Sequence, residues 1–150
     1  MRVLFRSFIL AALFVVAACD DAVLVSAVAS THVQYDITIQ SNPILREIES
    51  QTNGWNDEVN IAVENAPPGS SREDVIAAMA QFDFDLIPSD SEYRQSTHYF
   101  QTPLRPSDVA FRGPLLSDGV CGIDFLASAQ FDEDDRLVRI VGWKVMGGCL

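Results

Sequence analysis

Hydrophobic and polar residues alternate from Val33 to Gln40, and this period of two predicts a half-buried strand. Asn42 and Pro43 then have the character of an N-cap and a first helical residue. The helix predicted from here is about two turns long, ends near Asn53-Gly54, and has an apolar stripe made of Ile44, Leu45 and Ile48. Alternation resumes from Val59 to Val63 and predicts a second short strand.

A longer helix is predicted to begin at Ser70, after the break at Pro67-Pro68-Gly69. Ser70 and Glu73 have capping-box spacing, and Asp74 adds a second negative charge to the first turn, where the helix dipole favours it. Apolar residues recur at helical spacing up to Phe82, where the periodicity ends: Val75, Ile76, Met79, Ala80 and Phe82.

The last third of the chain has the pattern of an antiparallel sheet. Residues 95–102 are strand-like, residues 102–119 are rich in proline and glycine and predict a long loop, and alternate apolar positions predict a strand over 121–131. An acidic turn at 132–135 leads into a final strand over 136–146, followed by a flexible tail. The whole pattern predicts an α+β fold of two layers, with one or two helices packed on a small antiparallel sheet that ends in a C-terminal β-hairpin.

The N-terminus has the layout of an export signal. Arg2 and Arg6 precede an apolar stretch from Ser7 to Cys19, and Asp20 and Asp21 end that stretch abruptly. The competing interpretation, a transmembrane helix, needs about 20 apolar residues, whereas this stretch has 13. The signal is therefore the better interpretation.

The end of this signal, Val16-Ala17-Ala18-Cys19, resembles the lipobox of bacterial lipoproteins. The resemblance implies cleavage between Ala18 and Cys19, and diacylglycerol on the thiol of Cys19; a stray cysteine after an ordinary signal is the alternative. The predicted organisation is a signal peptide over 1–18, a lipidated N-terminus and tether over 19–31, and a single extracytoplasmic domain over 32–150. Whether residues 22–31 form a strand, a helix or only a tether stays open.

The charge balance is strongly acidic. The full chain has a formal net charge of −11, and loss of residues 1–18 removes two arginines, which lowers it to −13. Such a surface repels phosphate, so neither nucleic acid nor an anionic bilayer is an electrostatic partner. A membrane would be held through the lipid anchor alone.

Cys121 and Cys149 are left as an even pair in an exported, oxidising compartment, which predicts a disulfide. Pairing Phe131 with Arg136 across the acidic turn puts Cys121 opposite Met146, three residues from Cys149. The two glycines between them would let the chain end curl back until the thiols meet. Two free thiols are the alternative.

No residue pattern predicts catalysis, a cofactor or a metal. His32 and His98 lack ligands at suitable spacing, and the run 132–135 lacks the glycine and the later glutamate of a calcium loop. Candidate contacts for a partner are two tryptophans and two residues of the predicted loop: Trp55, Trp143, Pro103 and Arg105. Either tryptophan can instead belong to the core.

The segment from Pro68 to Met146 resembles the BamE-like (SmpA/OmlA) lipoproteins. The residues that carry the resemblance are a helix opened by residues 69–75, a strand ending in Tyr99-Phe100 and the hairpin of residues 131–138. It departs from the family at residues 83–85, where a Gly-x-Pro is missing, and in the long loop. The resemblance implies helices on a three-stranded sheet and an envelope scaffold that binds proteins of outer-membrane assembly.

Two functions follow as hypotheses. The first is a non-catalytic, lipid-anchored envelope module that binds another protein, in either the inner or the outer membrane. The second is a periplasmic lipoprotein that binds a ligand or inhibits a hydrolase, since an acidic surface suits a basic target such as a lysozyme.

Overall fold

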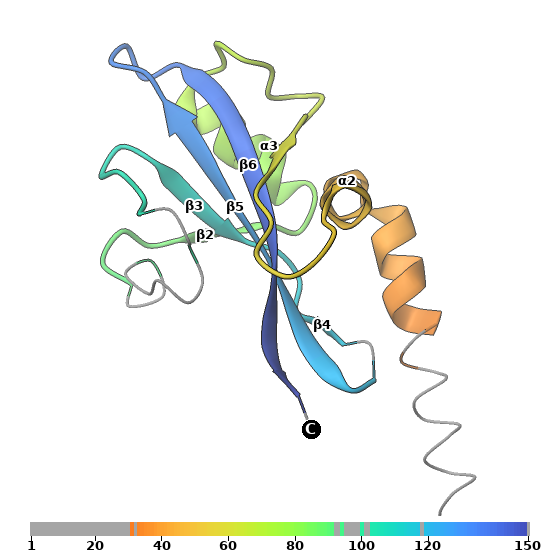
Figure 1. Ribbon diagram of the computed structural model, residues 1–150. Coiled ribbons are helices and arrows are strands. Elements are labelled where there is room, and N and C mark those ends of the chain that lie inside the picture. The colour runs from red at the N-terminus through yellow and green to blue at the C-terminus, as the bar shows by residue number, and fades with distance from the viewer. Residues whose placement is uncertain are drawn as a thin grey trace, which may run out of the picture.

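The computed structural model describes residues 31, 33–91, 94, 100, 103–117 and 119–149. Within these ranges the longer elements are three helices and one six-stranded antiparallel sheet, so the chain has the mixed α+β fold that its hydrophobic pattern predicts (Figure 1). Cys19, both histidines and the predicted strand over 95–102, apart from Phe100, lie outside the described residues.

The first helix covers residues 33–41, where alternation predicts a strand, so that prediction is wrong. Tyr35 and Ile39 are buried, whereas Val33 and Ile37 are more than half exposed. Each pair is four residues apart, which places its members on one face of a helix. The same four apolar residues therefore satisfy both periodicities, and packing of Tyr35 and Ile39 into the core selects the helix.

Helix α2 (Pro43–Gln51) confirms the second prediction. The Asn42 side chain accepts hydrogen bonds from the backbone N–H groups of Ile44 and Leu45, and Pro43 occupies the first turn. The stripe that packs inward is the predicted one, Ile44, Leu45 and Ile48. Asn42 also donates from Nδ2 to the carbonyl of Phe82 at 2.8 Å, which ties the start of α2 to the end of the next helix.

Helix α3 (Arg72–Ala80) begins one residue later than the capping box predicts. Its N-cap is Ser71, whose hydroxyl accepts from the N–H of Asp74 and donates to the Asp74 carboxylate at 2.8 Å. Val75, Ala78 and Met79 are buried, whereas Ala80, predicted on the apolar face, is exposed.

The sheet has the order β1-β6-β5-β3-β2, with β4 pairing β5 beyond the end of β3. The strands are β1 (Val59–Ile61), β2 (Asp85–Ile87), β3 (Val109–Arg112), β4 (Leu116–Ser117), β5 (Cys121–Phe131) and β6 (Leu137–Cys149). Strands β3 and β4 occupy the stretch predicted as a loop over 102–119, so that prediction is wrong for these residues. Strand β2 follows the point where helical periodicity fails and was not predicted either.

Two β-bulges set the register of β5 against β6. Phe131 lies opposite Leu137, Gln130 opposite Arg139, Ile123 opposite Met146 and Gly122 opposite Gly148. Val138 and Gly147 are therefore the extra residues of the two bulges. The turn pairs Phe131 with Leu137 and not, as predicted, with Arg136, which shifts the register by one residue, and the two bulges shift it by two more, so that Cys149 lies directly opposite Cys121. Strand β6 continues to Cys149, where the sequence predicts a flexible tail.

A hydrophobic core covers each face of the sheet at β5. Successive side chains of a strand point to opposite faces, so β5 contributes residues to both cores. The odd-numbered positions from Ile123 to Phe131 face a core that contains the buried residues of all three helices. The second core includes Leu126, Trp143 and Phe100. Phe100 meets the Trp143 ring edge-on at a centroid distance of 5.6 Å.

Candidate functional site

A groove of about 400 Å³ opens at the edge of the sheet, beside β1 and the first residues of β6. Strand β1 ends at Ile61, and residues 62–68 arc away from β6 before the chain returns (Figure 1). The return is fixed by two backbone hydrogen bonds on Leu137, whose carbonyl accepts from Gly69 N and whose N–H donates to Ser70 O, at 2.7 and 2.9 Å. The groove lies between these two attachments.

Local interactions hold the arc of residues 62–68 open. The N–H of Ala62 donates to Oε2 of Glu47 on α2 at 3.2 Å, which directs the chain away from β6 as soon as β1 ends. Ala66 N then donates to Val63 O at 2.9 Å to form a turn. Gly69 follows Pro67-Pro68 with a φ of +91°, a conformation that favours glycine, and completes the return.

The lining of the groove is mainly aliphatic. Buried residues of the first core form part of it, including Ile61, Leu137 and Ile140, and Val138 contributes a side chain that is 50% exposed. The remaining lining residues are Asn60, Ala62, Val63, Glu64, Ala66, Pro67, Pro68 and Arg139. A lining of this kind accommodates apolar side chains of another molecule, and it includes no serine, cysteine or histidine to act as a nucleophile.

Only Glu64 and Arg139 bring charge to this groove. Arg139 is already engaged, because its Nη2 lies 3.5 Å from the carboxylate of Glu58 and its Nε donates to Gln130 Oε1 at 2.8 Å. The exposed carboxylate of Glu64 is therefore the charge that is left at the rim for a ligand.

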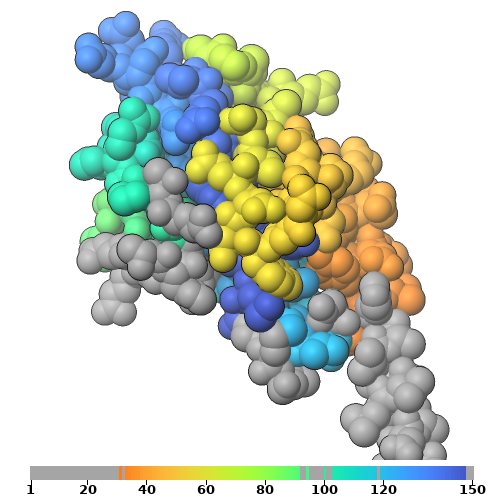
Figure 2. All heavy atoms as spheres, in the orientation of Figure 1, coloured from red at the N-terminus to blue at the C-terminus, as the bar shows by residue number. Residues whose placement is uncertain are grey.

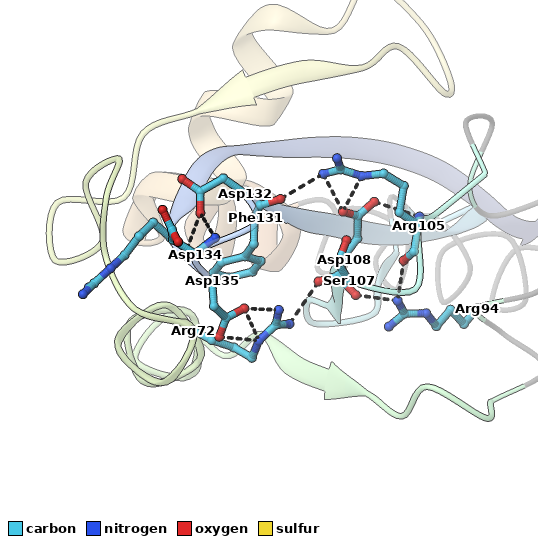
Figure 3. Close-up of polar contacts among 10 residues, drawn as sticks. Arg72, Arg94, Arg105, Ser107, Asp108, Phe131, Asp132, Asp134 and Asp135 are labelled. Atoms are coloured by element: carbon cyan, nitrogen blue, oxygen red, sulfur yellow. Dashed lines mark hydrogen bonds and ion pairs between the residues drawn. The ribbon is translucent and has the colours of Figure 1, made fainter.

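A second group of polar residues joins α3 to the β5–β6 turn (Figure 3). Arg72 forms an ion pair with Asp135, donates from Nη1 to the carbonyl of Ser107 at 3.0 Å, and places its guanidinium 4.4 Å from the centre of the Phe131 ring. The hydrogen bond from Arg72 lowers the pKa of Asp135 below its usual value, and the positive charges of Arg72 and Arg136 act in the same direction.

The adjoining turn of residues 105–108 uses two more arginines (Figure 3). Asp108 is 4% exposed, and its carboxylate accepts from the backbone N and the Nε of Arg105, at 2.9 and 3.0 Å. Arg105 also donates to the carbonyl of Phe131, and Arg94 donates to the carbonyls of Arg105 and Asp108. These guanidinium groups bind the protein's own oxygens, so the cluster is structural.

The same holds for other cations of the described chain. Arg112 forms two hydrogen bonds with the buried carboxylate of Asp124, and Lys144 lies 3.0 Å from Oε2 of Glu49. Because internal partners neutralise these cations, the excess carboxylates determine the charge that a partner meets.

The predicted contact residues are not brought together in one site. Trp55 is 37% exposed, with Nζ of Lys144 5.3 Å from its ring centre. Trp143 is 1% exposed in the second core, so it offers no surface to a partner. Pro103 is exposed, and Arg105 is committed to Asp108.

Cys121 is disulfide-bonded, and the backbone register puts Cys149 opposite it, as a bond between the two requires. In the described part of the chain, no three potential ligands from His, Cys, Asp or Glu gather into a metal site. Every helix described is also too short or too polar to serve as a transmembrane segment.

Comparison with protein-family models, curated proteins and solved structures found no match for this chain. The resemblances to lipobox proteins and to BamE-like lipoproteins therefore stay predictions. The groove was not predicted, because its walls come from segments about 75 positions apart in sequence. The one local signal was Pro67-Pro68-Gly69 directly after a short strand.

Proposed function

We propose that this chain is a lipoprotein of the bacterial cell envelope, anchored through acyl chains on Cys19, whose folded body is a non-catalytic module that binds another protein. The body that the proposal describes is the two-layer arrangement of helices on an antiparallel sheet with a C-terminal hairpin. The observation that carries the binding role is the aliphatic groove between β1, residues 62–68 and β6.

The chemistry of the groove supports a protein ligand. Val138, Pro67 and Pro68 present aliphatic surface to solvent at the edge of a sheet, where a partner segment can bury its own apolar side chains. Since Glu64 is the unpaired charge at the rim and the mature chain is strongly acidic, the favoured partner carries basic residues beside its apolar ones. The resemblance of residues 68–146 to BamE-like lipoproteins makes factors of outer-membrane assembly or maintenance candidate partners in this proposal.

Site-specific photocrosslinking in the native cells tests this role. A photoreactive amino acid replaces Val138, and the matched control replaces Leu86, which is 49% exposed on β2 outside the groove. We expect one discrete crosslinked product from position 138, absent at position 86, with a partner segment that contains both apolar and basic residues. No product at 138, or the same products at both positions, would contradict the proposal.

The acidic turn favours a second candidate function, inhibition of a basic hydrolase. Asp132, Glu133 and Asp134 are exposed in the β5–β6 turn (Figure 3), which the Arg72–Asp135 ion pair joins to the first turn of α3, where Glu73 and Asp74 are exposed as well. Such a surface attracts a cationic enzyme. Added in excess to a muramidase, the purified protein should slow hydrolysis at low ionic strength, and Glu133→Lys should weaken that effect. Unchanged hydrolysis at every protein concentration eliminates this candidate.

A further inference from the structure

One end of the molecule collects the start of the first helix, the β4–β5 connection and the last residues of β6. Figures 1 and 2 show these segments together at the lower end, with the β5–β6 turn at the upper end. Because the chain enters its first helix at this lower end, residues 1–30 are attached there by covalent connectivity.

This end exposes large apolar side chains. They come from three separate segments and are 37% to 62% exposed: Val33 and Ile37 from the helix, Leu115 and Val120 around β4, and Met146 from β6. A set of exposed aliphatic residues drawn from segments far apart in sequence marks an interaction surface.

Charged residues are few at this apolar end and concentrated at the other end. Residues 113–123 and 145–147 include one charged residue in the sequence, Asp118, and Asp36 is the only charged residue among the described residues of the first helix. At the other end, Glu73 and Asp74 lie near the four consecutive carboxylates of residues 132–135, with Arg72 and Arg136 as the cations. The protein is therefore polarised along its length, from an apolar end to an acidic end.

A short tether determines what the apolar end meets. Eleven residues, 20–30, separate the proposed acylated residue Cys19 from Thr31 at the start of the helix, and even fully extended this segment reaches only about 40 Å. Because the tether keeps the apolar end within this distance of the bilayer, the effective concentration of that end at the bilayer surface is high. An anionic bilayer repels the carboxylates at the acidic end, while the interface favours apolar side chains.

We infer that the end bearing Val33, Ile37, Leu115, Val120 and Met146 lies on the lipid bilayer, with the acidic turn directed away from it. This inference rests on the proposed anchoring through Cys19. The orientation leaves the groove at Val138 accessible to a partner, because that groove lies towards the acidic end of β6.

Depth-dependent fluorescence quenching of the lipidated full-length protein tests the orientation. Ile37→Cys, Leu115→Cys and Glu133→Cys variants are labelled with NBD and reconstituted into phosphatidylcholine–phosphatidylglycerol vesicles that contain nitroxide-labelled lipid. We expect the nitroxide to reduce fluorescence about twofold at positions 37 and 115, which lie at the interface, and to leave position 133 unaffected. Equal quenching at the three positions, or none at 37 and 115, would overturn the inference.

The intact mass of the purified protein, measured before reconstitution, separates this outcome from failure of the proposed function. A chain without an acyl adduct on Cys19 contradicts the anchor, and with it the inference. An acylated chain without quenching contradicts the orientation alone.

A charge variant gives an independent check. Val120→Glu should lower the quenching at position 37, because a carboxylate at the interface is repelled by anionic lipid, whereas the matched control Leu86→Glu should not. Circular dichroism establishes that both variants are folded. Equal effects of the two substitutions would count against contact between the apolar end and the bilayer.

Discussion

Arg72 connects three parts of the protein through one side chain. Its guanidinium binds Asp135 in the β5–β6 turn and the carbonyl of Ser107, and it lies over the ring of Phe131. Asp135 itself has a φ of 58°, in the left-handed region that aspartate tolerates better than most residues. The ion pair thus contributes to the geometry of the turn as well as to charge balance.

The lowered pKa of Asp135 predicts a pH dependence of stability. A carboxyl group whose pKa is lower in the folded than in the unfolded state stabilises the fold above the unfolded pKa, and this contribution is lost as the pH falls through the folded pKa. We expect an NMR titration to find the pKa of the Asp135 carboxyl below the usual range of an aspartate, and Arg72→Ala to raise that pKa back towards the usual range. An unchanged titration in the variant would show that Arg72 is not the cause.

Gly142 is required by close packing between β6 and α2. A Cβ at this position would lie 2.7 Å from both Cγ1 and Cδ1 of Ile48, a buried side chain with little room to move. Gly142→Ala should therefore destabilise the protein by about 1–3 kcal/mol in urea unfolding, the usual cost of overpacking a core. In the control Gly54→Ala, the new Cβ meets only Asp57 Oδ2 at 4.0 Å, so stability should hold or rise slightly.

At the scale of elements, the sequence predicts what local capping and long apolar runs determine. Asn42-Pro43 specifies the start of α2, and the apolar positions from Cys121 to Phe131 specify β5. Residues 33–41 and the strands β2, β3 and β4 escape prediction because their form depends on distant partners. β3, for example, has only four residues between proline-rich segments, and it is a strand because it pairs with both β5 and β2.

The cysteines show the same limit. The sequence predicts that Cys121 and Cys149 pair, but it places Cys121 opposite Met146, because it pairs Phe131 with Arg136 where the structure pairs Phe131 with Leu137, and because a regular hairpin gives no sign of the bulges at Val138 and Gly147. The candidate groove depends on one of these bulges and on an arc of chain distant in sequence, so no single segment reveals it.

A disulfide between Cys121 and Cys149 would stabilise the ends of β5 and β6. Closing 28 residues of separation is worth about 3–4 kcal/mol on the chain-entropy estimate. We expect Cys121→Ser, Cys149→Ser and the double variant to lower the free energy of unfolding by similar amounts, and peptide mapping to find the 121–149 crosslink in the native protein. Full additivity of the two single effects would show that the thiols do not act as a bonded pair.

At the scale of the whole molecule, the cations that are paired internally leave an acidic protein with one apolar end. Net charge alone would keep such a protein away from an anionic membrane, so its location depends on the residue to which lipid is attached.

Cys19→Ala should therefore release the protein from the membrane fraction. Two acyl chains anchor a protein stably, and without the acceptor thiol the chain keeps no membrane attachment of comparable strength. Cell fractionation measures the shift, with Cys121→Ala as the control that should stay in the membrane fraction. If the Cys19 variant also stays there, anchoring through this thiol is excluded.

The two bulges also determine where the chain tolerates a change in length. Strands usually reject single-residue deletions, because a shift of one position turns every later side chain to the opposite face. Removal of Val138 or Gly147 is different: each is an extra residue, so its loss leaves every other residue of β6 opposite the partner it has now. Homologous chains that are one residue shorter at either point can keep the same β5–β6 pairing and the same cysteine pair. A deletion at Trp143 would instead shift the register of the rest of β6 and move Cys149 away from Cys121.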